Sequence, residues 1–139
     1  MIQADALILT QPGKRIRLNQ LKAGNNVYSY DDCVGAVSAV TAATISDPVK
    51  LVVKDPAKQI RHQLIVSAET SIFGAAGWTR AGSLKEGTEV GIRMKDDKAV
   101  TLLPIDKLEK CQAVAGCSVA LDEPLGLVIN SYIVRAVTI

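Results

Sequence analysis

Short apolar runs separated by turn residues recur along the whole chain, and this pattern predicts strands almost everywhere. Residues 27–30 and 49–54 alternate between apolar and polar side chains, as strands with one buried face do. The runs are rich in Val, Ile, Thr and Leu and are bounded by Gly, Pro, Asp and Asn. Many short strands at near-regular spacing indicate an all-β sandwich or barrel-like fold. The predicted strands are residues 6–10, 15–17, 26–30, 34–43, 50–54, 62–66, 71–73, 89–95, 100–104, 112–114, 119–121, 127–129 and 132–137.

Helical signals are few and short. Residues 15–23 and 81–84 are each expected to contain a single helical turn. Asp106 is a good helix N-cap residue, so a short helix is expected over residues 106–110. No linker, low-complexity tract or charge block interrupts the chain.

The chain contains an internal repeat. Residues 4–27 align with residues 67–90 without a gap, at a constant offset of 63 residues. The best match is Leu-Lys-Ala-Gly-Asn-Asn-Val against Leu-Lys-Glu-Gly-Thr-Glu-Val, in which Gly24 and Gly87 mark turns that need positive φ. Two copies predict one pseudo-symmetric domain over residues 1–139 rather than a solenoid. A chance match of a common turn-into-strand pattern is the alternative.

Composition and charge narrow the function classes. The chain has 139 residues, of which 48% are hydrophobic and 22% charged, as expected for a globular domain with a real core. A net charge of +2 is too weak to indicate nucleic-acid binding by itself. Lys14, Arg15 and Arg17 alternate with an apolar residue, which favours a strand with a basic, solvated face. With Tyr28 and Tyr30, they leave a small β-barrel nucleic-acid binder as an open alternative.

The cysteines and the apolar runs bear on the compartment. Three cysteines, Cys33, Cys111 and Cys117, cannot form a complete set of disulfides. Cys111 and Cys117 could pair across a hairpin if oxidised, but two free thiols are favoured. No secretory leader opens the chain and no apolar run approaches the roughly 20 residues that span a bilayer. We therefore expect a cytoplasmic protein without a membrane segment.

Metal and cofactor sites are not expected. His62 is the only histidine, and a turn or strand-edge position explains it better than catalysis. The acidic pairs 31–32 and 96–97 are expected in hairpin turns rather than in a calcium site. Ser67 and Ser83 have no evident base partner, which argues against serine catalysis.

Two other side chains have specific expectations. Cys33 follows two aspartates, which raise the pKa of a thiol, so a reactive nucleophile is disfavoured there. Trp78 is the only tryptophan and is expected in the core of the second repeat unit, although an exposed indole would mark a contact surface.

Three segments, in this order, resemble the motifs of the Hint domain, the autoprocessing fold of hedgehog proteins and inteins. Residues 1–10 resemble the N-terminal intein motif, and residues 130–136 resemble the C-terminal one. Residues 64–70, followed by Gly77-Trp78, are similar to the second motif. The resemblance covers most of the chain, and it implies an all-β, pseudo-two-fold horseshoe of many short strands. Such a fold would require the repeat described above.

The N-terminal positions of the family's chemistry are changed in this chain. The resemblance implies a thiol or hydroxyl nucleophile at the first residue, but Met1 carries a thioether, which cannot attack a carbonyl. Met1 also looks like a translation start, in which case no upstream peptide bond is present. Thr70 stands where the family has a histidine that protonates the leaving nitrogen. Ser67 replaces the family's threonine and keeps only a hydroxyl.

The C-terminal positions are changed as well. The family's penultimate histidine falls on Arg135, whose guanidinium is always charged and cannot shuttle protons. The terminal asparagine, which would cyclise to release the chain, falls on Ala136. The chain also continues to Ile139, beyond the position where an intein would end.

The sequence therefore predicts a Hint-like domain without autocatalysis and without a cofactor. It would act as a structural or protein-interaction module, with a protein partner or a second copy of itself. A residual autoprocessing domain that uses Ser67 or Cys117 is the alternative from the enzyme class. The nucleic-acid binder is the second alternative.

Overall fold

A computed structural model describes residues 1–11, 13–94, 99–123 and 125–138. Over these residues the chain forms fifteen strands and two single turns of 3₁₀ helix. The strands are β1 (Ile2–Gln3), β2 (Leu7–Gln11), β3 (Lys14–Arg17), β4 (Asn26–Tyr28), β5 (Val34–Ile45), β6 (Pro48–Asp55), β7 (Ile60–Ser67), β8 (Ser71–Gly74), β9 (Gly77–Arg80), β10 (Glu89–Ile92), β11 (Thr101–Lys110), β12 (Val114–Leu121), β13 (Gly126–Ile129), β14 (Tyr132–Arg135) and β15 (Val137–Thr138). The helical turns are η1 (Leu18–Gln20) and η2 (Ala81–Ser83). The all-β prediction is thus confirmed.

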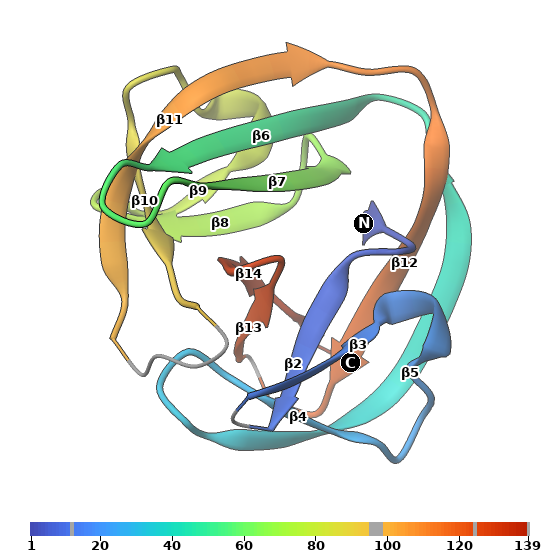
Figure 1. Ribbon diagram of the computed structural model, residues 1–139. Coiled ribbons are helices and arrows are strands. Elements are labelled where there is room, and N and C mark those ends of the chain that lie inside the picture. The colour runs from blue at the N-terminus through green and yellow to red at the C-terminus, as the bar shows by residue number, and fades with distance from the viewer. Residues whose placement is uncertain (12, 95–98, 124, 139) are drawn as a thin grey trace.

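The strands are joined by hydrogen bonds into one continuous path that bends around the molecule. The order along this path is β3-β2-β13-β14-β8-β10-β11-β6-β7-β1-β12-β5-β4. The long strands β5, β6, β11 and β12 curve around the outside of a horseshoe, and β13 and β14 lie near its centre (Figure 1). The first residue lies inside the horseshoe, beside β12 (Figure 1). This position places the start of the chain next to strands from both halves of the sequence.

Alternating apolar side chains from these strands fill one core. Eight of its members, each fully buried, are Ile8, Leu18, Val27, Leu51, Leu64, Leu127, Ile129 and Tyr132. They come from strands at both ends and in the middle of the sequence, so the core depends on non-local pairing. At about 25 cal/mol per Å² of apolar area, burial of these side chains is the main favourable contribution to folding.

Residues 4–27 and 67–90 fold into elements of the same order. β2, β3, η1 and β4 in the first segment correspond to β8, β9, η2 and β10 in the second. β3 and β9, like η1 and η2, start at the offset of 63 residues read from the sequence. Gly24 and Gly87 have φ of 91° and 89°, a conformation that glycine adopts without a steric penalty. Each of these segments is followed by a long strand that pairs with a long strand from the other half of the chain: β5 pairs with β12, and β11 pairs with β6.

The predicted helix over residues 106–110 is wrong. These residues belong to β11, which pairs with β6 past an irregularity between Ile105 and Lys107. Asp106 does not cap a helix; its carboxylate lies 3.6 Å from the Lys54 ammonium on β6. The local capping signal is overridden because β6 offers a full ladder of backbone partners to this segment.

Some other boundaries also differ from the prediction. The predicted strands 112–114 and 119–121 are parts of one strand, β12, whose ladder with β5 continues through Gly116. The predicted strand 89–95 ends at Ile92 in β10. The acidic pair 96–97 lies outside the described residues.

Two polar side chains tie distant turns together. The Asn130 amide oxygen accepts a hydrogen bond from the Leu7 backbone N–H at 2.8 Å, and its amide nitrogen donates to the Gln63 carbonyl at 2.9 Å. The Arg93 side chain, 1% exposed, donates to the carbonyls of residues 29 and 30 and to Asp32. Asn130, in the turn between β13 and β14, therefore joins this turn to β2 and β7, and Arg93 holds the turn that follows β4.

Among the described residues, no helix has the length and apolar character needed to cross a membrane.

Candidate functional site

A cavity of about 540 Å³ opens inside the horseshoe where the chain begins. All five positions that the family resemblance singled out line it: Met1, Ser67, Thr70, Arg135 and Ala136. They come from the start, the middle and the end of the sequence, and the fold brings them to one cavity. The other residues around the cavity are Ile2, Thr44, Ile45, Ser46, Asp47, Glu69, Ser71, Cys117, Ser118, Val119 and Leu127.

The first residues are held in place as a short central strand. Ile2 of β1 lies opposite Cys117 of β12 and opposite Val66 of β7. The Ser67 backbone N–H donates to the Met1 carbonyl at 2.8 Å, which continues the pairing with β7 by one residue. Met1 therefore lies at a fixed position, because backbone bonds from both sides define it.

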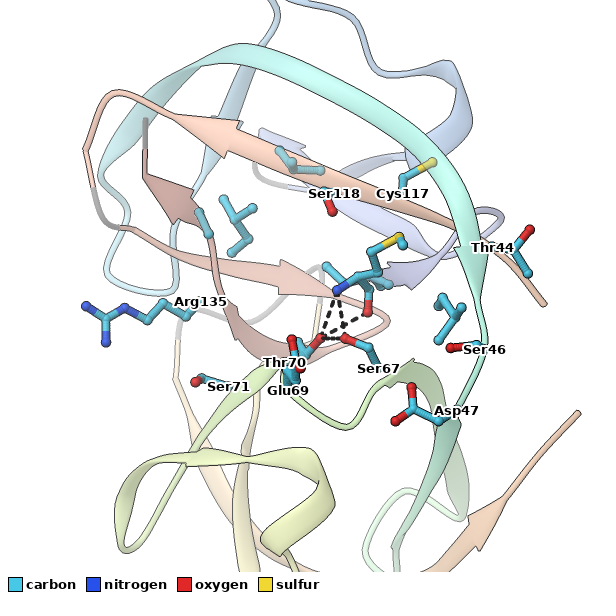
Figure 2. A pocket seen from close by; sticks show the side chains of 16 residues that line it. Thr44, Ser46, Asp47, Ser67, Glu69, Thr70, Ser71, Cys117, Ser118 and Arg135 are labelled. Carbon is cyan, nitrogen blue, oxygen red and sulfur yellow. Dashed lines mark hydrogen bonds between the residues drawn. The ribbon is translucent and has the colours of Figure 1, made fainter. Parts of the chain in front are cut away.

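Two hydroxyl groups surround the Met1 nitrogen. The nitrogen lies 2.8 Å from the Ser67 Oγ and 3.1 Å from the Thr70 Oγ1. The two hydroxyl oxygens are 2.8 Å apart, and the Thr70 hydroxyl also donates to the Met1 carbonyl at 3.0 Å. Figure 2 shows Ser67 and Thr70 side by side, joined by dashed hydrogen bonds. The turn from β7 to β8 supplies both groups, because the Thr70 N–H bonds back to the Ser67 carbonyl at 3.0 Å.

The charged groups of the cavity come from three different elements. Burial lowers the pKa of the Met1 amine below its ordinary value, while the nearby Glu69 carboxylate opposes this shift. Asp47 lines the cavity from the turn between β5 and β6. Arg135, at the end of β14, is exposed, and its side chain extends away from the two hydroxyls (Figure 2). The guanidinium is thus not placed to stabilise charge beside Met1.

Cys117 lines the same cavity but is a poor nucleophile. Its side chain is 2% exposed, and burial raises the pKa of its thiol. In Figure 2 the thiol points away from Ser67 and Thr70. A thiol in this state is mostly protonated near neutral pH and faces the wrong way for chemistry at Met1.

The chain does not end at the cavity on its C-terminal side. The Ala136 N–H donates to the Leu125 carbonyl at 3.0 Å, and β15 follows immediately. β15 runs parallel to β12, with Val137 opposite Ala120 and Thr138 opposite Leu121. Val137 and Thr138 are therefore part of the sheet.

Sequence reasoning missed several polar groups around this cavity. Thr44, Ser46 and Ser118 add hydroxyls, and Asp47 adds a carboxylate. Asp47 and the three hydroxyl residues lie on β5, β12 and the turn that follows β5, away from any recognised motif. No local signal could have found them, because only the long-range pairing of β5 with β12 brings these strands to the site.

The remaining candidate residues lie elsewhere. His62 is neither in a turn nor on a strand edge: it lies within β7 opposite Val53 and is 6% exposed. Its Nε2 has no hydrogen-bond partner in the described part of the chain, and burial lowers its pKa. Ser83 is exposed on η2, outside the cavity. Cys33 is exposed, and a hydrogen bond to Asp31 raises the pKa of its thiol, in line with the prediction.

The cysteines and Trp78 resolve two alternatives left open by the sequence. Cys111 and Cys117 are both free thiols. Trp78 is 37% exposed, and its ring meets Phe73 edge-on at 5.5 Å between centroids. The indole is thus half on the surface of β9 rather than enclosed in the core. Within residues 1–11, 13–94, 99–123 and 125–138, no group of three or more His, Cys, Asp or Glu side chains could hold a metal ion.

The residues of the nucleic-acid alternative come from different elements. Lys14, Arg15 and Arg17 lie on β3, which ends the path of strands. Tyr30 stacks on Phe73 at 5.4 Å, so this ring is engaged with β8 rather than free for a base.

Comparison with known proteins identifies the fold. No protein-family profile and no curated protein sequence matches the chain. Solved structures do match: the Ssp DnaB mini-intein variant M86 has a TM-score of 0.76 and 17% identity, over 97% of this chain and 92% of that one. The DnaB intein from Synechocystis sp. PCC 6803 has a TM-score of 0.77 and 19% identity, over 97% and 96%. The gp41-1 intein has a TM-score of 0.70 and 18% identity, over 96% and 95%.

The chain therefore has the intein-like Hint fold over nearly its whole described length. The match extends to nearly the full length of the solved inteins as well.

Proposed function

We propose that this chain is a Hint-fold domain without autoprocessing chemistry, which serves as a structural or protein-interaction module. The observation that carries the proposal is the cavity around Met1, Ser67, Thr70, Arg135 and Ala136, where the fold keeps the place but not the reactive groups. We further propose that residues 4–27 and 67–90 are copies of one unit in a single pseudo-symmetric domain. Free thiols at all three cysteines favour a reducing compartment such as the cytoplasm.

The groups beside the Met1 nitrogen cannot carry out cleavage at this residue. The Met1 thioether has no proton to lose and no nucleophilic sulfur anion to form. The Thr70 hydroxyl lies 3.1 Å from the nitrogen, where a general acid would act, but a threonine hydroxyl is too weak an acid to protonate a departing amide nitrogen near neutral pH. Thr70 thus keeps a hydrogen bond to the nitrogen but cannot assist its departure from a peptide bond.

The groups on the C-terminal side support the same proposal. Arg135 holds a permanent charge and cannot alternate between acid and base. Ala136 has no side-chain amide that could cyclise onto its own backbone carbonyl. Since β15 ties the following residues to β12, release at Ala136 would also have to break sheet pairing.

The test is a fusion of the chain between two unrelated carrier domains, followed by intact mass after overnight incubation with and without thiol. We expect one full-length mass in both conditions. Fragments cut at Met1 or Ala136 would contradict the proposal. If they vanish in Ser67→Ala but persist in Cys117→Ala, the residual autoprocessing alternative with Ser67 as nucleophile replaces it.

The interaction part of the proposal concerns surface residues and is tested separately. Trp78 and Leu102 are large apolar side chains with exposed fractions of 37% and 43%. A protein partner could bury them at an interface. Light scattering across a concentration series is expected to show an oligomer, or a pull-down to show a defined partner. A strict monomer without partners would contradict this part.

A further inference from the structure

The Ser67 hydroxyl has a base partner after all, and this partner is the Met1 amine. The sequence offers Ser67 no histidine or carboxylate, yet the fold places the amine nitrogen 2.8 Å from its Oγ. A hydroxyl activated by an amino-terminal amine is a known class of nucleophile in acyl-transfer enzymes. The distance lies within the range for a nucleophile and its base before substrate is bound.

We propose that, in the form of the chain whose Met1 amine is free, the cavity takes small acyl compounds and Ser67 is the nucleophile that attacks them. The Met1 amine acts as the general base. This inference goes beyond the proposed function, because it concerns an added substrate rather than cleavage of the chain itself. It does not require Met1 to be the natural first residue.

The hydrogen bonds suit this role when the amine is neutral. The Thr70 hydroxyl has one proton, which in this arrangement turns from the Met1 carbonyl to the Ser67 Oγ at 2.8 Å, since either oxygen of this pair can be the donor. The Ser67 hydroxyl donates to the amine nitrogen, and the amine N–H donates to the Thr70 Oγ1 at 3.1 Å. The three groups close a ring of hydrogen bonds in which Thr70 polarises the Ser67 oxygen and orients the amine.

Burial favours the neutral form of the amine. It disfavours the ammonium form and so lowers the pKa of the amine, although the Glu69 carboxylate opposes this effect. Three other titratable groups line the cavity: Asp47 from the turn after β5, Cys117 from β12 and Arg135 from β14. Burial is the larger of the two effects on the amine, so its pKa lies below the ordinary value.

The space around Ser67 admits a substrate. The cavity of about 540 Å³ is larger than a small ester requires, and Ser67 lies on its wall (Figure 2). Ser46, Ser71 and Ser118 also line it, but among the described residues the hydroxyls that bond to the amine are those of Ser67 and Thr70. Ser67 is thus distinguished from the other serines by its base, not by its access.

The reaction can be written with p-nitrophenyl acetate, whose leaving group departs without an acid. The Ser67 oxygen forms a bond to the carbonyl carbon, while its proton passes to the Met1 nitrogen. The bond to the phenolate oxygen then breaks, and p-nitrophenolate leaves as an anion. The ammonium then loses this proton to solvent. In the second half of the reaction, the amine takes a proton from a water molecule as the water oxygen bonds to the acetyl carbon. The bond from that carbon to the Ser67 oxygen breaks, the ammonium returns the proton to this oxygen, and acetic acid leaves and ionises to acetate.

The test measures p-nitrophenolate release and locates the acetyl group by peptide mass mapping. We expect an acetyl ester on Ser67 and a rate that rises with pH through the amine pKa. Ser67→Ala should lower the rate about a hundredfold, the scale of general-base catalysis, whereas Ser83→Ala, an exposed serine outside the cavity, should leave it unchanged. A chain with glycine added before Met1 should lose activity like Ser67→Ala, because its nitrogen becomes an amide.

Three results would overturn the inference. They are an acetyl amide on Met1 without an ester on Ser67, equal rates for Ser67→Ala and Ser83→Ala, and an undiminished rate in the glycine-extended chain. The extended chain keeps every side chain, so its result does not depend on whether Ser67→Ala folds. Stability of the carrier fusion is a separate readout, so failure here leaves the proposed function untouched.

Discussion

Replacing Arg93 with methionine tests whether a buried guanidinium holds the horseshoe together. Arg93 follows β10, and its backbone N–H donates to the Ser131 carbonyl at 2.8 Å. Its side chain donates to the Ser29 carbonyl at 3.1 Å, the Tyr30 carbonyl at 2.9 Å and the Asp32 carboxylate at 2.7 Å. Asp32 has a φ of 66°, so the turn that Arg93 holds is itself conformationally costly.

The magnitude follows from what the methionine would leave unpaired. Each hydrogen bond from a charged donor contributes about 1.5–3 kcal/mol, and a buried carbonyl without a partner costs about 1–3 kcal/mol. The Asp32 side chain is 44% exposed and regains water when Arg93 is lost, so its share is discounted. The Tyr30 carbonyl loses its charged donor, the Ser29 carbonyl keeps only the bond from the Asp32 N–H at 3.2 Å, and methionine recovers part of the apolar contact. We expect a loss of about 3 kcal/mol in unfolding free energy.

Urea unfolding followed by Trp78 fluorescence measures this loss, and thermal unfolding should show a fall in Tm of about 10 °C. Arg80→Met is the matched control, because Arg80 is exposed at the end of β9 and should change stability by less than about 0.5 kcal/mol. Asp32→Asn should fall between the two, at about 1 kcal/mol. Equal effects of Arg93→Met and Arg80→Met would refute the reasoning.

Three further predictions concern other parts of the fold. Burial lowers the pKa of His62 below 6.5, so the unfolded chain binds more protons and stability should fall as pH drops below about 6.5; His62→Gln should flatten this pH dependence of the urea midpoint, and an unchanged slope would contradict the assignment. Asn130→Ala removes the bonds to Leu7 and Gln63 and should cost about 2 kcal/mol in urea unfolding, whereas no loss would show that the sheet ladders alone hold this turn. Gly87→Ala meets no atom within 4 Å but is strained at φ 89°, so about 1 kcal/mol should be lost by calorimetry, and a gain in Tm would disprove the strain argument.

Much of the fold could be predicted because its signals are local. The repeat offset of 63 residues reappears in η1 and η2, since each Leu-Lys-x-Gly segment fixes its own turn through a glycine at positive φ. The resemblance singled out Met1, Thr70 and Arg135 as equivalents of the family's reactive positions, and the fold brings all three to one cavity.

The failures have a common physical cause, which is pairing between distant strands. Asp106 carries a helix-cap signal, but β6 draws its segment into a sheet. His62 looks like a turn residue, but it lies opposite Val53 in the ladder between β6 and β7 and is buried. The bond between Ser67 and the Met1 amine joins residues 66 positions apart, so no spacing rule could reveal it.

The central claim is that the fold keeps the geometry of an autoprocessing site and has lost only its reactive groups. The most direct measurement is thiol-induced cleavage of the carrier fusion at residue 1, compared between the unchanged chain and the double variant Met1→Cys, Thr70→His. The double variant regains a thiol for attack and an acid next to the leaving nitrogen, and the hydroxyl of Ser67 stays in place. We predict cleavage by thiol in the double variant and none in the unchanged chain. Cleavage of the unchanged chain would contradict the loss of chemistry, and an inert, folded double variant would contradict the retained geometry.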